Sequence, residues 1–180
     1  MPPAYLRTMR RYLSRSKRPT IFDMGLIVFR ENVLRHERVR HRLQGQLLRS
    51  IADERNGEVI DQDIIKRVLA MMVALGVRSH EVYAKDFEGP FLQSSQEFFR
   101  QESLQFLTQN NCIEYIAKAE QRIEEERQRV IRYLDSSTEG KLRSIAEAEL
   151  IDRHARHLVE MDSGCTAMLR DGKKEYLRKM

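Results

Sequence analysis

The sequence has little of what β-sheets, disulfide scaffolds and membrane spans require. Its 180 residues include 8 Gly and 4 Pro, which leaves few residues for the tight turns of an all-β fold. Trp is absent, and the two cysteines, Cys112 and Cys165, are far apart, as in an intracellular protein with reduced thiols. No apolar run reaches the roughly 20 residues that span a bilayer, and the start lacks the apolar core of a secretory signal. We therefore expect a cytoplasmic and nuclear protein without a membrane partner.

What is abundant is material for amphipathic helices. Hydrophobic residues make up 41% of the chain and charged residues 33%, and Leu, Arg, Glu, Gln, Ala and Ile are common helix formers. Apolar residues recur at helical spacing between turn signals such as Pro19, Asn56-Gly57, Gly76 and Asn110-Asn111. We expect helices over residues 4–16, 22–34, 36–54, from Asp61 to Gly76, 83–109, 112–134 and 139–161. Short loops between helices favour an all-α fold of antiparallel bundles or stacked helices.

The positive charge is concentrated at the amino-terminal end. The first 50 residues contain 12 Lys and Arg against 3 Asp and Glu, whereas the remaining 130 contain 20 against 24. A basic end suggests an electrostatic attachment, either to nucleic acid or to an acidic protein surface. Within it, Tyr5 and Tyr12 are interleaved with arginines, a pattern that suits either partner. Because no nucleic-acid-binding motif surrounds these residues, a nucleic-acid module is the less favoured hypothesis.

The residues that could carry chemistry have simpler structural explanations. A Gly-rich phosphate loop, a nucleophile elbow and a Cys/His pair are all missing, so we expect neither catalysis nor a cofactor. His154 and His157 lie three residues apart on a predicted helix, but a stable zinc site needs three or four ligands, so no metal site is expected. The run from Glu124 to Glu126 is expected to form a solvated face. The aromatic cluster is expected to be core, and it comprises Phe87, Phe91, Phe98, Phe99 and Phe106.

Several strings of residues are too specific to be generic helix patterns. They are Tyr83, Phe87-Glu88, Pro90-Phe91-Leu92, Phe98-Phe99 and Glu102-Ser103; Glu54-Arg55-Asn56-Gly57-Glu58; Tyr115, Lys118-Ala119-Glu120, Arg122, Glu125-Glu126 and Arg129; and Tyr133-Leu134-Asp135 with Ser137-Thr138. Together they resemble the amino-terminal stalk of the cullins, the backbone subunits of cullin–RING ubiquitin ligases. The resemblance covers nearly the whole chain from about residue 5.

Within that family, the chain is most similar to the third cullin type, which binds substrate adaptors that carry BTB domains. The strings that indicate this type run from Phe22 to Arg30, from Gly57 to Asp61 and from Val159 to Met161. The resemblance implies stacked antiparallel helical bundles, the five-helix cullin repeats. It assigns residues 1–19 to the last helix of the first repeat, 20–135 to the second repeat, and 136–180 to the start of a truncated third.

The resemblance also implies an adaptor-binding site near the amino terminus. In cullins the later of two docking helices carries a Tyr followed three residues on by an Arg, which Tyr12 and Arg15 match, with Met9 one turn earlier. A Tyr offers a large apolar contact with one polar tip, and an Arg can pair with an acidic adaptor surface. The alternative is that Tyr12 packs half-buried against the next helix.

The function that follows from the resemblance is non-catalytic scaffolding. A helical stalk would hold a BTB-type adaptor at a fixed distance from the ubiquitin-loading machinery and so support ubiquitin-dependent protein degradation. In the family, the earlier docking helix would lie upstream of Met1. The carboxy-terminal half of a cullin, which recruits the RING subunit, is likewise not part of this sequence. We therefore expect this chain to be a fragment. No nucleic-acid partner is expected, and the competing hypothesis is a basic helical nucleic-acid-binding module.

Overall fold

Helices follow one another through residues 19–161, the part of the chain that the computed structural model describes. They are α2 (Ile21–Phe29), a π-helical turn η1 (Arg30–Leu34), α3 (Glu37–Arg55), α4 (Gln62–Leu75), α5 (Glu81–Tyr83), a second π-helical turn η2 (Ala84–Glu88), α6 (Gly89–Gln109), α7 (Cys112–Tyr133), the 3₁₀ turn η3 (Ser136–Thr138), α8 (Glu139–Leu150), the 3₁₀ turn η4 (Asp152–His154) and α9 (Ala155–Glu160). No strand occurs among the described residues, which confirms the prediction of an all-α fold.

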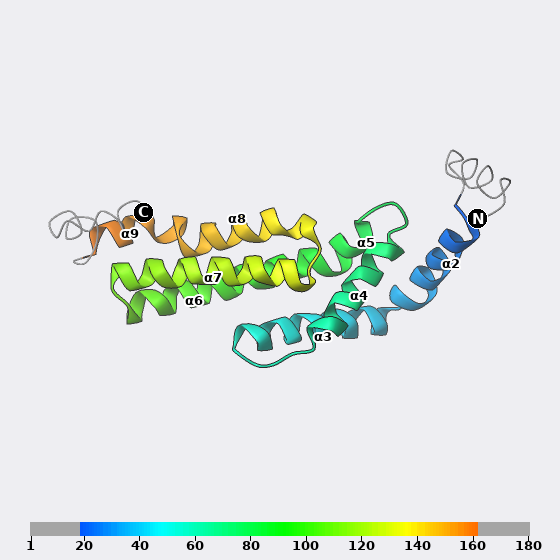
Figure 1. The fold of residues 1–180 in the computed structure, drawn as a ribbon, viewed down its shortest axis with the longest axis horizontal. Coiled ribbons are helices and arrows are strands. Elements are labelled where there is room, and N and C mark those ends of the chain that lie inside the picture. The colour runs from blue at the N-terminus through cyan, green and yellow to red at the C-terminus, as the bar shows by residue number, and fades with distance from the viewer. Residues whose placement is uncertain (1–18, 162–180) are drawn as a thin grey trace, which may run out of the picture.

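The helices form an elongated body, with α2 and α9 at opposite ends (Figure 1). Helices α6, α7 and α8 pack side by side, with α7 antiparallel to both α6 and α8, and α4 contacts α7 and α2. This arrangement confirms the prediction of stacked antiparallel bundles. None of the helices in residues 19–161 combines the length and apolar character needed to cross a membrane.

Side-chain caps set the helix boundaries that the sequence predicts. Thr20 and Asn111 each form a capping box at the start of α2 and α7, and the Asp61 carboxylate accepts the Ile64 N–H at 3.0 Å at the start of α4. At the end of α3, Gly57 has a φ of 92°, a left-handed conformation that favours glycine. Local chemistry therefore explains most of these boundaries.

Pro90 lies where a π-helical turn joins α5 to α6. The run from Glu81 to Gln109 is continuous, and Pro90 falls in the first turn of α6, directly after η2. A proline lacks the N–H of the helical ladder and its ring crowds the carbonyl four residues earlier, so it requires a helix start or a kink. The structure confirms this expectation for the predicted helix 83–109.

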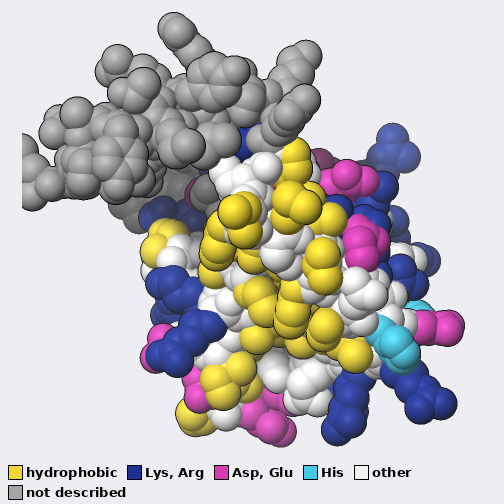
Figure 2. Space-filling model, turned by 90° about the vertical axis from the view of Figure 1, so that its right-hand side faces the viewer, with side chains coloured by type: hydrophobic (Ala, Val, Ile, Leu, Met, Phe, Trp, Pro, Cys, Tyr) yellow, Lys and Arg dark blue, Asp and Glu magenta, His cyan; other side chains and the backbone are white. Residues whose placement is uncertain are grey.

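The core runs along the length of the body. Tyr83, Phe87, Phe91 and Phe99 are each at most 1% exposed. The ring centres of Tyr83 and Phe87 lie 5.5 Å apart, and those of Phe87 and Phe91 lie 5.3 Å apart. Phe98 and Phe106 pack partly buried against this core. The aromatic cluster is therefore core, as predicted. On the surface, apolar side chains gather at the α2 end (Figure 2).

The predicted single helix over residues 139–161 is wrong, because the chain breaks after Leu150. In a continuous helix the Leu150 carbonyl would accept the His154 N–H. Instead the Tyr115 hydroxyl donates to that carbonyl at 2.6 Å, and the His154 N–H donates to the Ile151 carbonyl at 3.0 Å. The His154 imidazole is buried in the break, with its Nε2 2.9 Å from the Ser103 hydroxyl. Contacts from α6 and α7 therefore end α8.

We expect the break to be sensitive to acid. Burial, followed by the positive charges of Arg153 and His157, lowers the pKa of His154 from its usual 6.5, while Glu149 opposes this shift. A lowered pKa means that the folded protein binds the proton less readily than the unfolded chain. The contribution of neutral His154 to the free energy of unfolding is therefore complete above pH 6.5 and is lost as the pH falls further. Ser103 and Tyr115, which face the ring from α6 and α7, place no charge beside it.

The measurement is urea unfolding at a series of pH values between about 5 and 8. His154→Gln should flatten the fall in unfolding free energy toward low pH, whereas His41→Gln, at an exposed position on α3, should leave that fall unchanged. An identical pH slope for His154→Gln and the unaltered chain would contradict the assignment.

Candidate functional site

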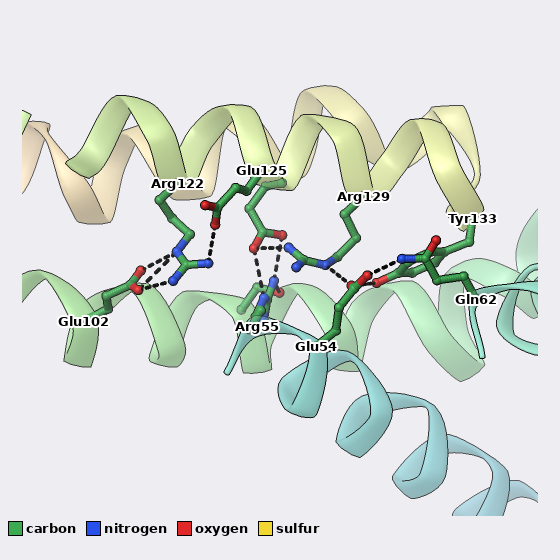
Figure 3. A network of polar contacts seen from close by, with 10 residues as sticks. Glu54, Arg55, Gln62, Glu102, Arg122, Glu125, Arg129 and Tyr133 are labelled. Atoms are coloured by element: carbon green, nitrogen blue, oxygen red, sulfur yellow. Dashed lines mark hydrogen bonds and ion pairs between the residues drawn. The ribbon is translucent and has the colours of Figure 1, made fainter. Parts of the chain in front are cut away.

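The predicted adaptor-binding residues Met9, Tyr12 and Arg15 lie outside the described residues. The site that the structure does show is a buried cluster of charged side chains where the end of α3 meets α6 and α7 (Figure 3). We call it the polar joint, and it comprises Glu54, Arg55, Glu126, Arg129 and Tyr133. The resemblance noted in the sequence implies a scaffold, which requires a fixed angle between its parts, so we take this cluster as the candidate functional site.

Arg55 is the centre of the polar joint. Its Nε and Nη2 donate to the two carboxylate oxygens of Glu126 at 2.9 Å and 3.0 Å, and Nη2 also reaches the Ser95 hydroxyl at 2.8 Å. The guanidinium carbon lies 4.9 to 5.4 Å from three ring centres, those of Phe91, Phe98 and Phe99. A planar guanidinium can combine a paired carboxylate contact with stacking on aromatic rings, which a lysine cannot reproduce.

Arg129 and Glu54 extend the joint toward the end of α7. Arg129 donates to Glu126 and, through Nε, to Glu54 at 2.7 Å. The Tyr133 hydroxyl donates to the same Glu54 oxygen at 2.6 Å, and the Gln62 amide donates to the other oxygen at 2.6 Å. Residues from α3, α4 and α7 therefore meet on one carboxylate, which fixes three helices relative to one another.

The charges of the joint compensate one another in a buried environment. The side chains of Arg55 and Glu126 are 3% and 2% exposed. Burial alone would raise the pKa of Glu126, but Arg55 and then Arg129 outweigh it, so the pKa is held below its usual value. Burial alone would likewise raise the pKa of Glu54, but the hydrogen bonds from Tyr133 and Arg129 outweigh it, so this pKa too is held below its usual value. Both carboxylates are therefore ionised and paired at neutral pH.

The prediction that Glu124, Glu125 and Glu126 form a solvated face is wrong for Glu126. Glu124 is exposed and pairs with Arg127 on its own helix, but Glu126 points inward to Arg55, a residue 71 positions earlier in the chain. The local pattern of an acidic run does not reveal a partner at such a distance. One signal could have revealed this partner: Glu54-Arg55, Glu126 and Arg129 all belong to the strings that resemble cullins.

Two further groups of polar contacts continue the joint along the bundle. Arg122 of α7 donates through Nε to Glu102 of α6 at 2.9 Å and through Nη1 to Glu125 at 2.6 Å (Figure 3). At the other side, the Tyr83 hydroxyl lies 2.7 Å from the Thr138 hydroxyl, which reaches Glu88 at 3.0 Å. Tyr83 of α5 and Glu88 of η2 are thereby both tied to η3, the turn that connects α7 with α8.

The joint has the chemistry of a structural site. A shallow cleft of about 690 Å³ lies beside it, and its lining includes Arg55, the Arg122–Glu125 pair and the Arg129–Glu54 pair. Within residues 19–161 no group of three or more His, Cys, Asp or Glu side chains is arranged to hold a metal ion. What this arrangement can do is keep the helices at a fixed angle.

The helical order, the elongated shape and the inter-helix polar joint define the chain as an α-helical solenoid. The family model described as the cullin α-solenoid domain matches residues 3–180. The chain belongs to the cullin family.

Curated relatives support the resemblance to the third cullin type. The chain is 40% identical over 172 residues to Cullin-3 of Dictyostelium discoideum, covering 95% of this chain and 22% of that protein. It is also 40% identical over 172 residues to Cullin-3B of Arabidopsis thaliana, covering 95% and 23%. Cullin-2 of Arabidopsis thaliana is 34% identical over 170 residues, covering 94% and 23%. The chain therefore spans less than a quarter of the length of these relatives.

Proposed function

We propose that this chain serves as part of the scaffold of a cullin–RING ubiquitin ligase and binds a BTB-type adaptor at its amino-terminal end. Its contribution is geometric, since a stiff helical spacer holds two separately bound proteins at a set distance and orientation. It performs no bond-making step with its own side chains, and it acts in the cytoplasm and nucleus. The RING subunit would be reached only through the carboxy-terminal half found in full-length relatives.

The observation that carries the proposal is the polar joint. It ties α3, α4 and α7 together through side chains that are buried and mutually paired. Such a network rigidifies the structure around it when every member is satisfied. Rigidity along an elongated body is what a spacer needs, and an isolated binding module has no need of it.

The adaptor contact is assigned to Met9, Tyr12 and Arg15. Interface hot spots are enriched in Tyr and Arg, and losing one costs about 2 kcal/mol or more. Domain boundaries near residues 19 and 135 remain part of the proposal, with residues 20–135 as one complete repeat.

Tyr12→Ala tests the adaptor contact. Loss of one hot-spot side chain should weaken binding to a purified BTB-domain protein by about 30-fold, which is roughly 2 kcal/mol. Isothermal titration or a pull-down measures this, with Arg127→Ala, an exposed position on α7, as the control that should bind normally.

Salt separates the proposal from the nucleic-acid alternative. An interface anchored on Tyr12 should keep most of its affinity for the BTB protein at moderate salt. A chain that binds oligonucleotides with an affinity that falls log-linearly with salt, and is indifferent to Tyr12→Ala, would refute the adaptor proposal.

A further inference from the structure

The beginning of α3 is exposed on every side and strongly basic. Each residue from Arg35 to Arg42 is exposed, and residues 35–50 contain five arginines against one acidic residue, Glu37. Helix α3 forms the lower edge of the body in Figure 1, and Lys and Arg side chains project from the same edge in Figure 2. A helix that is polar all round requires side-chain pairs or a second body beside it.

Three of these arginines form a straight stripe along α3. At about 100° per residue, Arg38, Arg42 and Arg49 fall within about 40° of one another around the helix. The buried Leu47 and Ile51 lie on the opposite side, toward the core. The arginines are four and seven residues apart, so the stripe is about 17 Å long at a rise of about 1.5 Å per residue. We call these three arginines the α3 stripe.

The α3 stripe has no acidic partner among the described residues. Within residues 19–161, the guanidinium groups of Arg38 and Arg42 make no hydrogen bond or ion pair, and Arg49 donates to the Gly45 carbonyl of its own helix at 3.2 Å. Arg55, at the other end of the same helix, is instead fully paired with Glu126. The positive charge of the stripe is therefore available to another molecule.

The α3 stripe weakens the helix that carries it. Arg38 and Arg42 are four residues apart, so their like charges repel. Both lie in the first two turns of α3, where a positive charge opposes the helix dipole. His36 at the N-cap position forms no side-chain hydrogen bond that would offset these effects. A negatively charged partner beside the stripe would relieve both.

Gly45 lies in the stripe between Arg42 and Arg49. A glycine inside a helix lowers its stability relative to alanine. A Cβ at Gly45 would meet no atom of another described element within 4 Å, so packing within residues 19–161 does not require a glycine here. Its small size leaves the backbone of α3 open to the close approach of another segment.

An acidic helix fits this surface better than a nucleic acid does. Residues 35–50 contain no Phe, Tyr or Trp, so bases have none of these rings to stack on. After residue 50 the chain has 24 acidic and 20 basic residues, so a long polyanion would meet repulsion beyond the stripe. A helix with carboxylates four and seven residues apart presents them at the intervals of the arginines, and a guanidinium pairs with a carboxylate through two parallel hydrogen bonds.

We propose that the α3 stripe binds an acidic helix of a partner protein. The carboxylates of that helix face Arg38, Arg42 and Arg49, and its backbone passes close to Gly45. Because exposed ion pairs are individually weak, this contact orients the partner and speeds its association more than it holds it. The contact is separate from the adaptor contact at the amino-terminal end and does not depend on it.

The test of the charges uses the full chain and a labelled, alanine-based helical peptide with glutamates four and seven residues apart on one face. Arg38→Gln combined with Arg42→Gln should weaken binding of this peptide by about tenfold, the loss expected for two surface ion pairs. Arg100→Gln combined with Arg132→Gln removes the same charge at exposed positions on α6 and α7 and should leave the affinity nearly unchanged. Fluorescence anisotropy at low salt measures both.

The role of Gly45 is tested with an uncharged side chain. Gly45→Gln should weaken binding of the same peptide, because the added side chain keeps the two helices apart. Gly140→Gln, at an exposed glycine of α8 that also has open space around it, should bind normally. Neither glutamine variant of the stripe arginines should lower the stability of α3, since each removes a repulsive charge.

Three results would overturn the proposal. The first is a patterned peptide that fails to bind at low salt. The second is equal binding of a peptide with the same composition whose glutamates are spread around the helix, because the stripe would then recognise charge without spacing. The third is a DNA duplex that binds more tightly than the patterned peptide and loses its affinity on Arg38→Gln with Arg42→Gln, because the stripe would then serve a nucleic acid.

Discussion

Replacing Arg55 with Met should lower the free energy of unfolding by about 3–5 kcal/mol, because it leaves Glu126 buried with one of its two guanidinium partners removed. Glu126 is 2% exposed, so water cannot replace the missing donors. The Ser95 hydroxyl would lose its contact with Arg55 as well. Methionine preserves much of the apolar contact with the phenylalanine rings, so the loss reports mainly on the charge. Urea unfolding followed by circular dichroism provides the measurement.

Two companion variants define what the Arg55 result means. Arg127→Met removes an exposed pair with Glu124 on the same helix as Glu126 and should change stability by no more than about 0.5 kcal/mol. Adding Glu126→Leu to Arg55→Met should recover a large part of the loss, since it removes the orphaned charge. An Arg55→Met protein that unfolds within about 1 kcal/mol of the unaltered chain would show that the joint is not a buried charge cluster.

Tyr115→Ala should also lower the free energy of unfolding by about 3–5 kcal/mol, the range for removing a large buried ring. Tyr115 is fully buried, and its ring centre lies 6.3 Å from both Phe106 and His154. Tyr115→Phe keeps the ring and removes only the hydroxyl that donates to Leu150, so it should lower stability by about 1–3 kcal/mol. Ile131→Ala, at an exposed position on the same helix, should have little effect.

The two Tyr115 variants also test why α8 ends at Leu150. If the hydroxyl holds the Leu150 carbonyl, then Tyr115→Phe should alter amide exchange at His154 and in α9 more than in α6. Equal exchange there in the unaltered chain and in Tyr115→Phe would show that something other than this hydrogen bond interrupts the helix.

Helix boundaries were predictable wherever a neighbour in sequence sets them. Asp61 caps α4 and Asn111 caps α7 through bonds that span three residues, and Gly57 supplies the left-handed turn after α3. The phenylalanine spacing along α6 likewise identified the core. These features depend on chemistry within one or two helical turns, so the order of residues suffices to infer them.

The features that sequence alone missed depend on partners far along the chain. The apolar spacing from Leu150 to Leu158 continues without a stop signal, and the interruption comes from Tyr115 and Ser103 on other helices. In the sequence Glu126 looks like its exposed neighbour Glu124, and only the folded structure places Arg55 beside it. The residues that carried the resemblance meet in pairs in space, such as Tyr83 with Thr138 and Arg122 with Glu102. We attribute their specificity to these contacts.

The π-helical turn η2 explains how the buried rings stay in line. Tyr83, Phe87, Phe91, Ser95 and Phe99 follow one another at intervals of four residues, a spacing that slowly drifts around an ordinary α-helix. A π turn accommodates more residues than an α turn, and η2 lies within this series, where it offsets the drift. Deleting one residue between Ala84 and Glu88 would rotate Phe91 and everything after it by about 100°. The length of this short segment is therefore as constrained as its composition.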